Sequence, residues 1–185
     1  AILAGGLGRY LEAHGVATAG VELRAICPVS MRPPANSAAL GNLVSTMIAP
    51  LFVGIEDPVE RLAAEREAME HLKSNDQAGG FHLMSQLGDR IPPVWQALAG
   101  MFSVPNTLFN TVSTNLPGPQ IPLYLGGSEL LDWYPLGPLS SGIGLFVAIL
   151  SYNGKLTMGT TVDPNLVPDV WELSGYLEES YEELR

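Results

Sequence analysis

Apolar side chains recur at helical spacing in three parts of the chain, residues 1–13, 57–73 and 168–184. The apolar positions are Leu3, Leu7, Tyr10 and Leu11 in the first, Val59, Leu62, Ala63, Met69 and Leu72 in the second, and Val170, Leu173, Leu177, Tyr181 and Leu184 in the third. Asp57 suits the N-terminal cap of the second helix, and Gly15 suits the end of the first. A fourth helical region, residues 81–102, is expected to bend at its Pro-Pro pair.

β-branched and apolar runs bounded by turn-forming residues predict five strands. They cover residues 21–29, 42–53, 107–116, 144–152 and 155–162. Asn153 and Gly154 separate the last two strands and predict a type I′ hairpin. This order of elements favours an α/β (α+β) fold. We expect a two-layer sandwich in which a mixed, largely antiparallel sheet is covered by helices.

Composition limits the partners that the chain can bind. Its 185 residues suffice for one domain with a core, and a hydrophobic content of 46% suggests that some apolar surface meets a partner. A formal net charge of −10 argues against nucleic acid, which requires clustered Lys and Arg. Acidity also disfavours anionic lipid but leaves apolar contact with neutral lipid open. A single cysteine, Cys27, is typical of a reducing cytoplasm.

The polar residues before a Pro-Gly-Pro break are the strongest candidates for chemistry. In a strand, Ser113 and Asn115 point to one face and Thr114 to the other. Acyl transfer passes through a tetrahedral oxyanion, which a preplaced hydroxyl or amide donor stabilises by about 3 kcal/mol. The alternative is that Ser113 and Asn115 satisfy backbone groups around the turn at residues 117–119. The sequence leaves both interpretations open.

The three histidines are isolated, and we expect none of them to be a catalytic base. His14 adjoins the end of a helix, where a cation interacts favourably with the helix dipole. His71 lies in a charged helix, and His82 has no evident acidic partner. No spacing of Cys, His, Asp and Glu predicts a metal site.

Small and aromatic residues allow further predictions. The glycines at residues 5–8 are expected to permit close packing of helices. Gly142 and Gly144 either leave room for an acyl chain beside a strand or mark a bulge. Trp133 and Tyr134 either contact lipid or lie in the core, and we expect the core, because aromatic side chains contribute much of the area that cores bury.

Several collinear blocks resemble the bacterial wax ester synthase/diacylglycerol acyltransferase family. Residues 113–119 are similar to its Ser-Asn-x-Pro-Gly-Pro signature, and residues 122–127 to its Pro-Leu-Tyr-x-x-Gly signature. Residues 23–32 are similar to its Leu-Arg-Ala-x-x-Pro-Val-Ser-x-Arg block. Leu-Gly-Asn at 40–42 and Asp-Pro-Val-Glu-Arg-Leu at 57–62 follow in order.

This resemblance implies that residues 1–185 are one C-terminal acyltransferase domain, truncated at its N-terminus, of a coenzyme A-dependent acyltransferase-like enzyme. The family's His-His-x-x-x-Asp-Gly motif belongs to the N-terminal half, which is the expected partner. Acyl-CoA and a long-chain alcohol or diacylglycerol are the implied substrates, with no separate cofactor. Asn115 and Ser113 then support catalysis, and Thr114, Gly142 and Gly144 contact substrate.

Two other readings stay open. The domain is alternatively a non-catalytic lipid-binding or partner-binding module of the same fold. Peptide-bond-forming condensation domains fit less well, because the Pro-Val-Ser and Pro-Leu-Tyr blocks match wax ester synthases better. The sequence does not predict whether the acceptor is a long-chain alcohol or diacylglycerol, because that choice depends on the shape of the active-site tunnel that the resemblance implies. We expect a cytoplasmic protein and leave peripheral contact with a membrane or lipid inclusion open.

Overall fold

The computed structural model describes residues 1–30, 44–74, 108–139 and 142–185. In chain order its elements are α1 (Ile2–Ala13), β1 (Leu23–Ser30), β2 (Val44–Leu51), α2 (Pro58–Ser74), β3 (Thr111–Pro117), β4 (Tyr124–Leu125), β5 (Ser128–Glu129), β6 (Leu145–Tyr152), β7 (Lys155–Val162) and α5 (Val170–Glu182). The helix predicted over 81–102, with its bend at Pro92 and Pro93, and His82 lie outside the described residues. No helix within the described ranges is long and apolar enough to cross a membrane.

Five strands form the predicted mixed sheet, in the order β2-β1-β3-β6-β7. The outer pairs β1–β2 and β6–β7 are antiparallel, whereas β3 pairs in parallel with β1 and β6. β3 begins at Thr111, later than expected. Just before β3, Asn110 Oδ1 accepts a hydrogen bond from the Arg24 N–H at 2.8 Å, so a side-chain oxygen takes the place that a backbone carbonyl would have in a continued strand. Asn153 and Gly154 have φ of 45° and 77°, as the hairpin between β6 and β7 requires.

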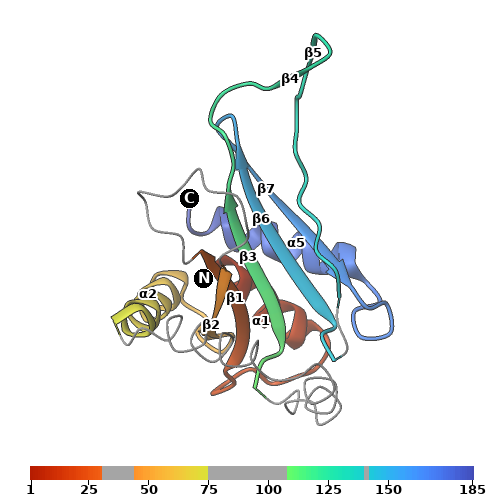
Figure 1. Ribbon diagram of the computed structural model, residues 1–185. Coiled ribbons are helices and arrows are strands. Elements are labelled where there is room, and N and C mark those ends of the chain that lie inside the picture. Colours follow the sequence, from red (N-terminus) through yellow and green to blue (C-terminus); the bar gives the residue numbers. More distant parts are fainter. Residues whose placement is uncertain (31–43, 75–107, 140–141) are drawn as a thin grey trace, which may run out of the picture.

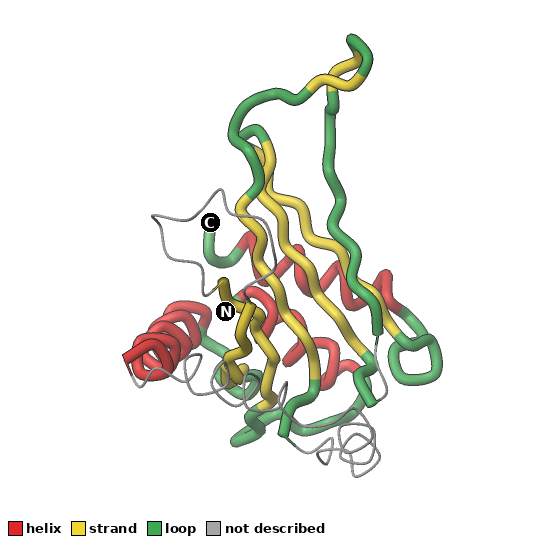
Figure 2. The backbone as a smooth tube through the Cα atoms, in the orientation of Figure 1, coloured by secondary structure: helices red, strands yellow, loops and turns green. Residues whose placement is uncertain are grey.

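Helices α1 and α5 pack on the same face of the sheet and form the second layer (Figures 1 and 2). Glycines in α1 allow this approach. A Cβ on Gly6 would lie 2.6 Å from Leu177 Cδ2, and one on Gly8 would lie 2.5 Å from Val53 O. The predicted close packing is therefore confirmed. The buried core residues between the layers include Leu3, Leu7, Tyr10, Ala25, Leu145, Val147, Leu173 and Leu177.

Helix α2 begins where the sequence predicted, but its buried residue is a charged one. Asp57 Oδ1 accepts the N–H groups of Val59 and Glu60 at 2.9 and 2.8 Å. In the expected apolar stripe, Val59 is 68% and Leu62 48% exposed. Arg61 is only 3% exposed, because its guanidinium reaches backbone carbonyls in the turn before α2.

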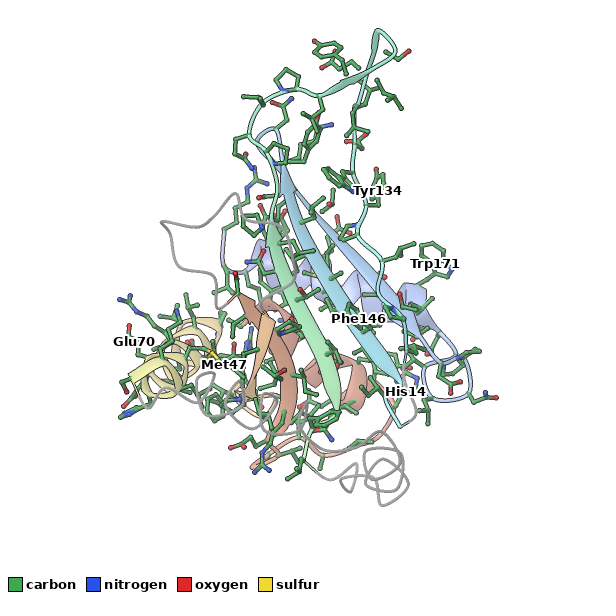
Figure 3. All side chains as sticks on the ribbon, in the orientation of Figure 1. His14, Met47, Glu70, Tyr134, Phe146 and Trp171 are labelled. Atoms are coloured by element: carbon green, nitrogen blue, oxygen red, sulfur yellow. The ribbon has the colours of Figure 1, made fainter. Side chains whose placement is uncertain are left out.

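Residues 118–139 form an arm that extends beyond the sheet and returns along it. β4 and β5 form the hairpin at its tip (Figures 1 and 2). The returning part follows β7 on the face opposite the helices, where Thr157 Oγ1 donates to Trp133 O at 2.6 Å. Figure 3 shows Tyr134 on this part. The prediction that Trp133 and Tyr134 lie in the core was wrong. They are 43% and 68% exposed, because no described element covers the arm.

A candidate active-site strand and the surrounding cavities

β3 carries the three candidate polar side chains in the middle of the sheet. Ser113 pairs with Val147 and Asn115 with Ile149, whereas Thr114 pairs with the intervening Ala148. Val147 is fully buried in the core beneath α1 and α5. Paired residues share a face, so Ser113 and Asn115 lie on the helix-covered face and Thr114 lies on the other. Ser113 is half-buried and Asn115 is exposed.

Other residues hold the turn that follows β3. Gly118 N–H donates to Ser151 Oγ at 3.3 Å, and Gln120 Nε2 donates to Gly118 O at 3.0 Å. A Cβ on Gly118 would collide with Ser151 O, which explains the glycine between two prolines. Within the described residues, the side chains of Ser113 and Asn115 have no hydrogen-bond partner. The turn therefore does not occupy the Asn115 amide.

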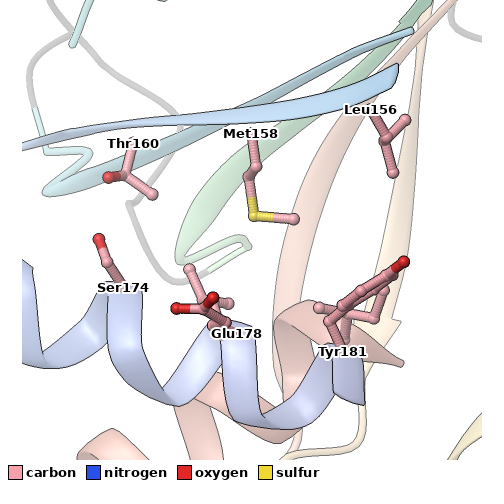
Figure 4. A pocket seen from close by; sticks show the side chains of 8 residues that line it. Leu156, Met158, Thr160, Ser174, Glu178 and Tyr181 are labelled. Atoms are coloured by element: carbon pink, nitrogen blue, oxygen red, sulfur yellow. The ribbon is translucent and has the colours of Figure 1, made fainter. Parts of the chain in front are cut away.

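An open groove of about 470 Å³ lies between β7 and α5 on the same face of the sheet (Figure 4). Its lining residues are Ile2, Leu156, Met158, Thr160, Ser174, Leu177, Glu178 and Tyr181. Asn115 pairs with Ile149, and Ile149 pairs in turn with Met158. Two strand spacings separate Asn115 from Met158, a distance of about 10 Å. A neutral amide donor and a largely apolar groove are thus close together on one face.

Gly142 and Gly144 lie elsewhere. Both line a second cavity of about 290 Å³ near the start of β6, walled mainly by apolar residues of α1, β1 and α5. Gly142 has a φ of +82°, and a Cβ on Gly144 would lie 2.5 Å from Leu166 Cδ1, so backbone conformation and packing account for both glycines. Gly144 lies five residues before Ile149, the residue paired with Asn115, which is about 16 Å along the strand. The structure does not bring these glycines together with Asn115.

His14 forms a hydrogen-bonded cluster that the sequence did not reveal. Its Nδ1 lies 2.8 Å from Tyr10 O, and its Nε2 lies 3.0 Å from Asp169 Oδ2. Tyr10 donates its hydroxyl to Asp169 Oδ1 at 2.6 Å. The bond to Tyr10 O and then the bond to Asp169 raise the pKa of His14. Burial, followed by the bond to Asp169, raises the pKa of Tyr10 to about 12.

This cluster also holds the one group of potential metal ligands within the described part of the chain. Donor atoms of His14, Asp169 and Glu172 lie within 4.8 Å of one another. Both ring nitrogens of His14 already have protein partners, and the Tyr10 bond lowers the pKa of Asp169 and so favours its charged form. Asp169 and the groove residue Tyr181 are at opposite ends of α5, about 18 Å apart along the helix. Among the described residues, the lining of the groove does not include His14.

Comparison with known proteins identifies the family. The family model of the WS/DGAT C-terminal domain matches the sequence of residues 40–185, which include β3, the arm and α5. The chain belongs to this family. It is 31% identical over 162 residues to a Mycobacterium tuberculosis H37Rv protein named as a diacylglycerol O-acyltransferase, covering 86% of this chain and 35% of the relative. A second protein of that strain, similarly named, is 32% identical over 192 residues, covering 100% of this chain and 38% of the relative.

The fold is also that of a solved family member. The wax ester synthase/diacylglycerol acyltransferase from Marinobacter aquaeolei VT8 superposes with a TM-score of 0.73 at 24% identity. The match covers 99% of this chain and 41% of that protein. The expected α/β fold and the family resemblance are both confirmed. The chain spans about two fifths or less of the length of each of these WS/DGAT relatives.

Proposed function

We propose that this chain is the C-terminal part of an O-acyltransferase that moves a fatty acyl group from acyl-CoA to a long-chain alcohol or diacylglycerol. Membership of the WS/DGAT family supports the reaction class. The single structural observation that carries the proposal is the position of Asn115. Its amide has no partner among the described residues and lies on the same face as an apolar groove.

In the proposed reaction, a histidine of the N-terminal half removes the proton from the acceptor alcohol. The alcohol oxygen attacks the thioester carbonyl, and a tetrahedral oxyanion forms. Its collapse breaks the carbon–sulfur bond, and the coenzyme A thiolate takes up the proton. The Asn115 amide donates to the oxyanion, with the Ser113 hydroxyl next to it on the same face. Acyl-CoA is a substrate, and no separate cofactor takes part.

We assign the aliphatic chain of one substrate to the groove between β7 and α5. Leu156, Met158 and Leu177 supply apolar contacts, and burial of a methylene group contributes about 0.8 kcal/mol. The assignment of Thr114, Gly142 and Gly144 to substrate contact remains part of the proposal. Its support is that the two glycines line a largely apolar cavity, whereas Thr114 is on the opposite face of the sheet.

The N-terminal half of the same enzyme is the proposed partner. The arm supports this, because its large apolar side chains are exposed on both sides of the β4–β5 hairpin. They include Ile121, Tyr124, Leu125, Leu131, Tyr134 and Leu136. Several large apolar side chains exposed on one arm favour an interaction site. Cytoplasmic location and contact with a membrane or lipid inclusion belong to the same proposal, supported by the single cysteine and by these exposed side chains.

The alternative is a non-catalytic lipid-binding or partner-binding module, favoured by an apolar groove that has no histidine among its described lining residues. Product analysis separates the two. The complete polypeptide is incubated with labelled palmitoyl-CoA and either hexadecanol or diacylglycerol, and the lipids are separated. We expect labelled wax ester or triacylglycerol. Saturable binding of labelled acyl chain with no ester product from either acceptor would favour the binding module.

A further inference from the structure

The end of α1 and the start of α5 bring one histidine and two carboxylates together. His14 follows the last residue of α1, Asp169 precedes the first residue of α5, and Glu172 lies in the first turn of α5. Donor atoms of the three side chains lie within 4.8 Å of one another. All three side chains reach solvent, so a dissolved ion has access to them. The proposed acyl transfer uses none of them.

The His14 ring is oriented by a backbone carbonyl. Its Nδ1 lies 2.8 Å from Tyr10 O, and because a carbonyl oxygen only accepts hydrogen bonds, Nδ1 carries a proton. The other ring nitrogen, Nε2, lies 3.0 Å from Asp169 Oδ2. The Nε2 lone pair and an ionised carboxylate oxygen are both acceptors. A positive centre therefore lies between them, either the second proton of an imidazolium or a metal ion.

An outer contact also orients the Asp169 carboxylate. Its Oδ1 accepts the Tyr10 hydroxyl at 2.6 Å, which leaves Oδ2 facing His14. Tyr10 is only 7% exposed and belongs to the core, so it is a fixed support. Metal-binding histidines commonly donate their second ring N–H to a carbonyl or carboxylate, and metal-binding carboxylates are themselves hydrogen-bonded. Tyr10 supplies both supports, one from its backbone and one from its side chain.

The separation of the donor atoms suits a tetrahedral zinc ion. Zinc binds imidazole nitrogen and carboxylate oxygen at about 2.0–2.2 Å, so neighbouring ligand atoms are about 3.3 Å apart. His14 Nε2 and Asp169 Oδ2 are 3.0 Å apart. The Glu172 side chain is exposed and makes no hydrogen bond within the described residues, so it is free to adjust. An imidazole ligand favours zinc over magnesium and calcium, which prefer oxygen ligands.

We propose that His14 Nε2 and the carboxylates of Asp169 and Glu172 form a zinc-binding site, with water as the fourth ligand. The ion takes the place of the proton between His14 and Asp169. Zinc then links α1 to α5 through residues 155 positions apart and stabilises the folded protein. The site goes beyond the proposed acyl transfer and does not depend on it.

The test is to measure zinc bound by the complete polypeptide. The protein is first treated with a chelator and then dialysed near neutral pH against zinc chloride. We expect His14→Gln to bind one zinc ion fewer per chain than wild type at saturation. His71→Gln is the matched control, because His71 is an exposed histidine on α2, away from the cluster. Its zinc content should equal that of wild type.

A second variant tests the site without removing any hydrogen bond of the cluster. Glu172→Gln should weaken binding of this zinc ion about tenfold or more, since even outer partners of a metal site contribute that much. Zinc should also raise the melting temperature of wild type more than that of His14→Gln. Equal zinc content in wild type and His14→Gln, or equal zinc affinity in wild type and Glu172→Gln, overturns the proposal.

Discussion

The hydroxyl of Tyr152 donates a hydrogen bond to the backbone carbonyl of Leu130 at 2.9 Å. The same oxygen accepts the N–H of Leu123 at 2.8 Å. Tyr152 ends β6 and is 1% exposed, whereas Leu123 and Leu130 flank the hairpin formed by β4 and β5. One buried side chain thus holds both sides of the β4–β5 hairpin at its base.

Replacing Tyr152 with Phe should destabilise the protein by about 0.5–1.5 kcal/mol, because it removes two partly buried hydrogen bonds. Chemical denaturation measures the loss, and amide exchange at Leu123 should become faster. Tyr124→Phe is the control, since Tyr124 lies exposed at the arm tip. Equal stability of Tyr152→Phe and wild type would show that this hydroxyl does not anchor the arm.

Two glycines in packed helices should respond in opposite ways to alanine. A Cβ on Gly5 of α1 meets Ser180 Oγ and Arg61 Nη2, whereas one on Gly175 of α5 has no atom within 4 Å. Gly175→Ala should therefore stabilise by about 0.5–1 kcal/mol through helix propensity. Gly5→Ala should destabilise by about 1–3 kcal/mol through overpacking. Thermal melts of both variants check this, and a stabilised Gly5→Ala would contradict the observed packing of α1.

Stability should depend on the charge of His14. Its pKa is raised from 6.5 by the bond to Tyr10 O and then by Asp169, so the protonated form favours the folded state. This contribution is fully present below the unfolded pKa and is lost as pH rises through the folded pKa. An NMR titration of the His14 ring should give a pKa above 6.5, lowered by Asp169→Asn. Asp132→Asn, which alters the exposed pair with Lys155, should leave it unchanged. A wild-type value at or below 6.5 is incompatible with this account.

Asn115→Ala in the complete enzyme should lower kcat by about 10²-fold, as expected for loss of one oxyanion donor. Its melting temperature should stay near that of wild type, because the amide makes no hydrogen bond in the described structure. Ser113→Ala should have a smaller effect. If Asn115 were instead structural, melting temperature would fall and the folded variant would turn over normally. Measuring kcat and melting temperature on the same samples separates these outcomes.

Local patterns predicted most of the described secondary structure. The spacing of Leu3, Leu7 and Tyr10 placed the core face of α1, and Asn153-Gly154 placed the β6–β7 hairpin, because both signals arise between near neighbours in sequence. The alternation along β3 likewise predicted that Ser113 and Asn115 share a face. Sequence is informative wherever a repeat of two or 3.6 residues decides the geometry.

What the sequence did not predict depends on tertiary contacts. Trp133 is an aromatic residue of the kind that cores often contain, but its segment runs along an outer face of the sheet. Hydrophobicity alone does not distinguish a core residue from one on a partner surface. The burial of Arg61 depends on two backbone acceptors in the adjoining turn. His14 and Asp169 are 155 positions apart and meet only through the packing of α1 on α5. The groove near Asn115 likewise requires β7 and α5 to be in place.

The most direct test of the proposed function is coenzyme A release from a long-chain acyl-CoA with hexadecanol as acceptor. It is measured first with this chain alone and then with the N-terminal half of the enzyme added. The account predicts no turnover by the chain alone, because none of the described histidines lines the groove or pairs with Asn115, and turnover once both halves are present. Robust turnover by the isolated chain, or none from a folded complex of both halves, would contradict it.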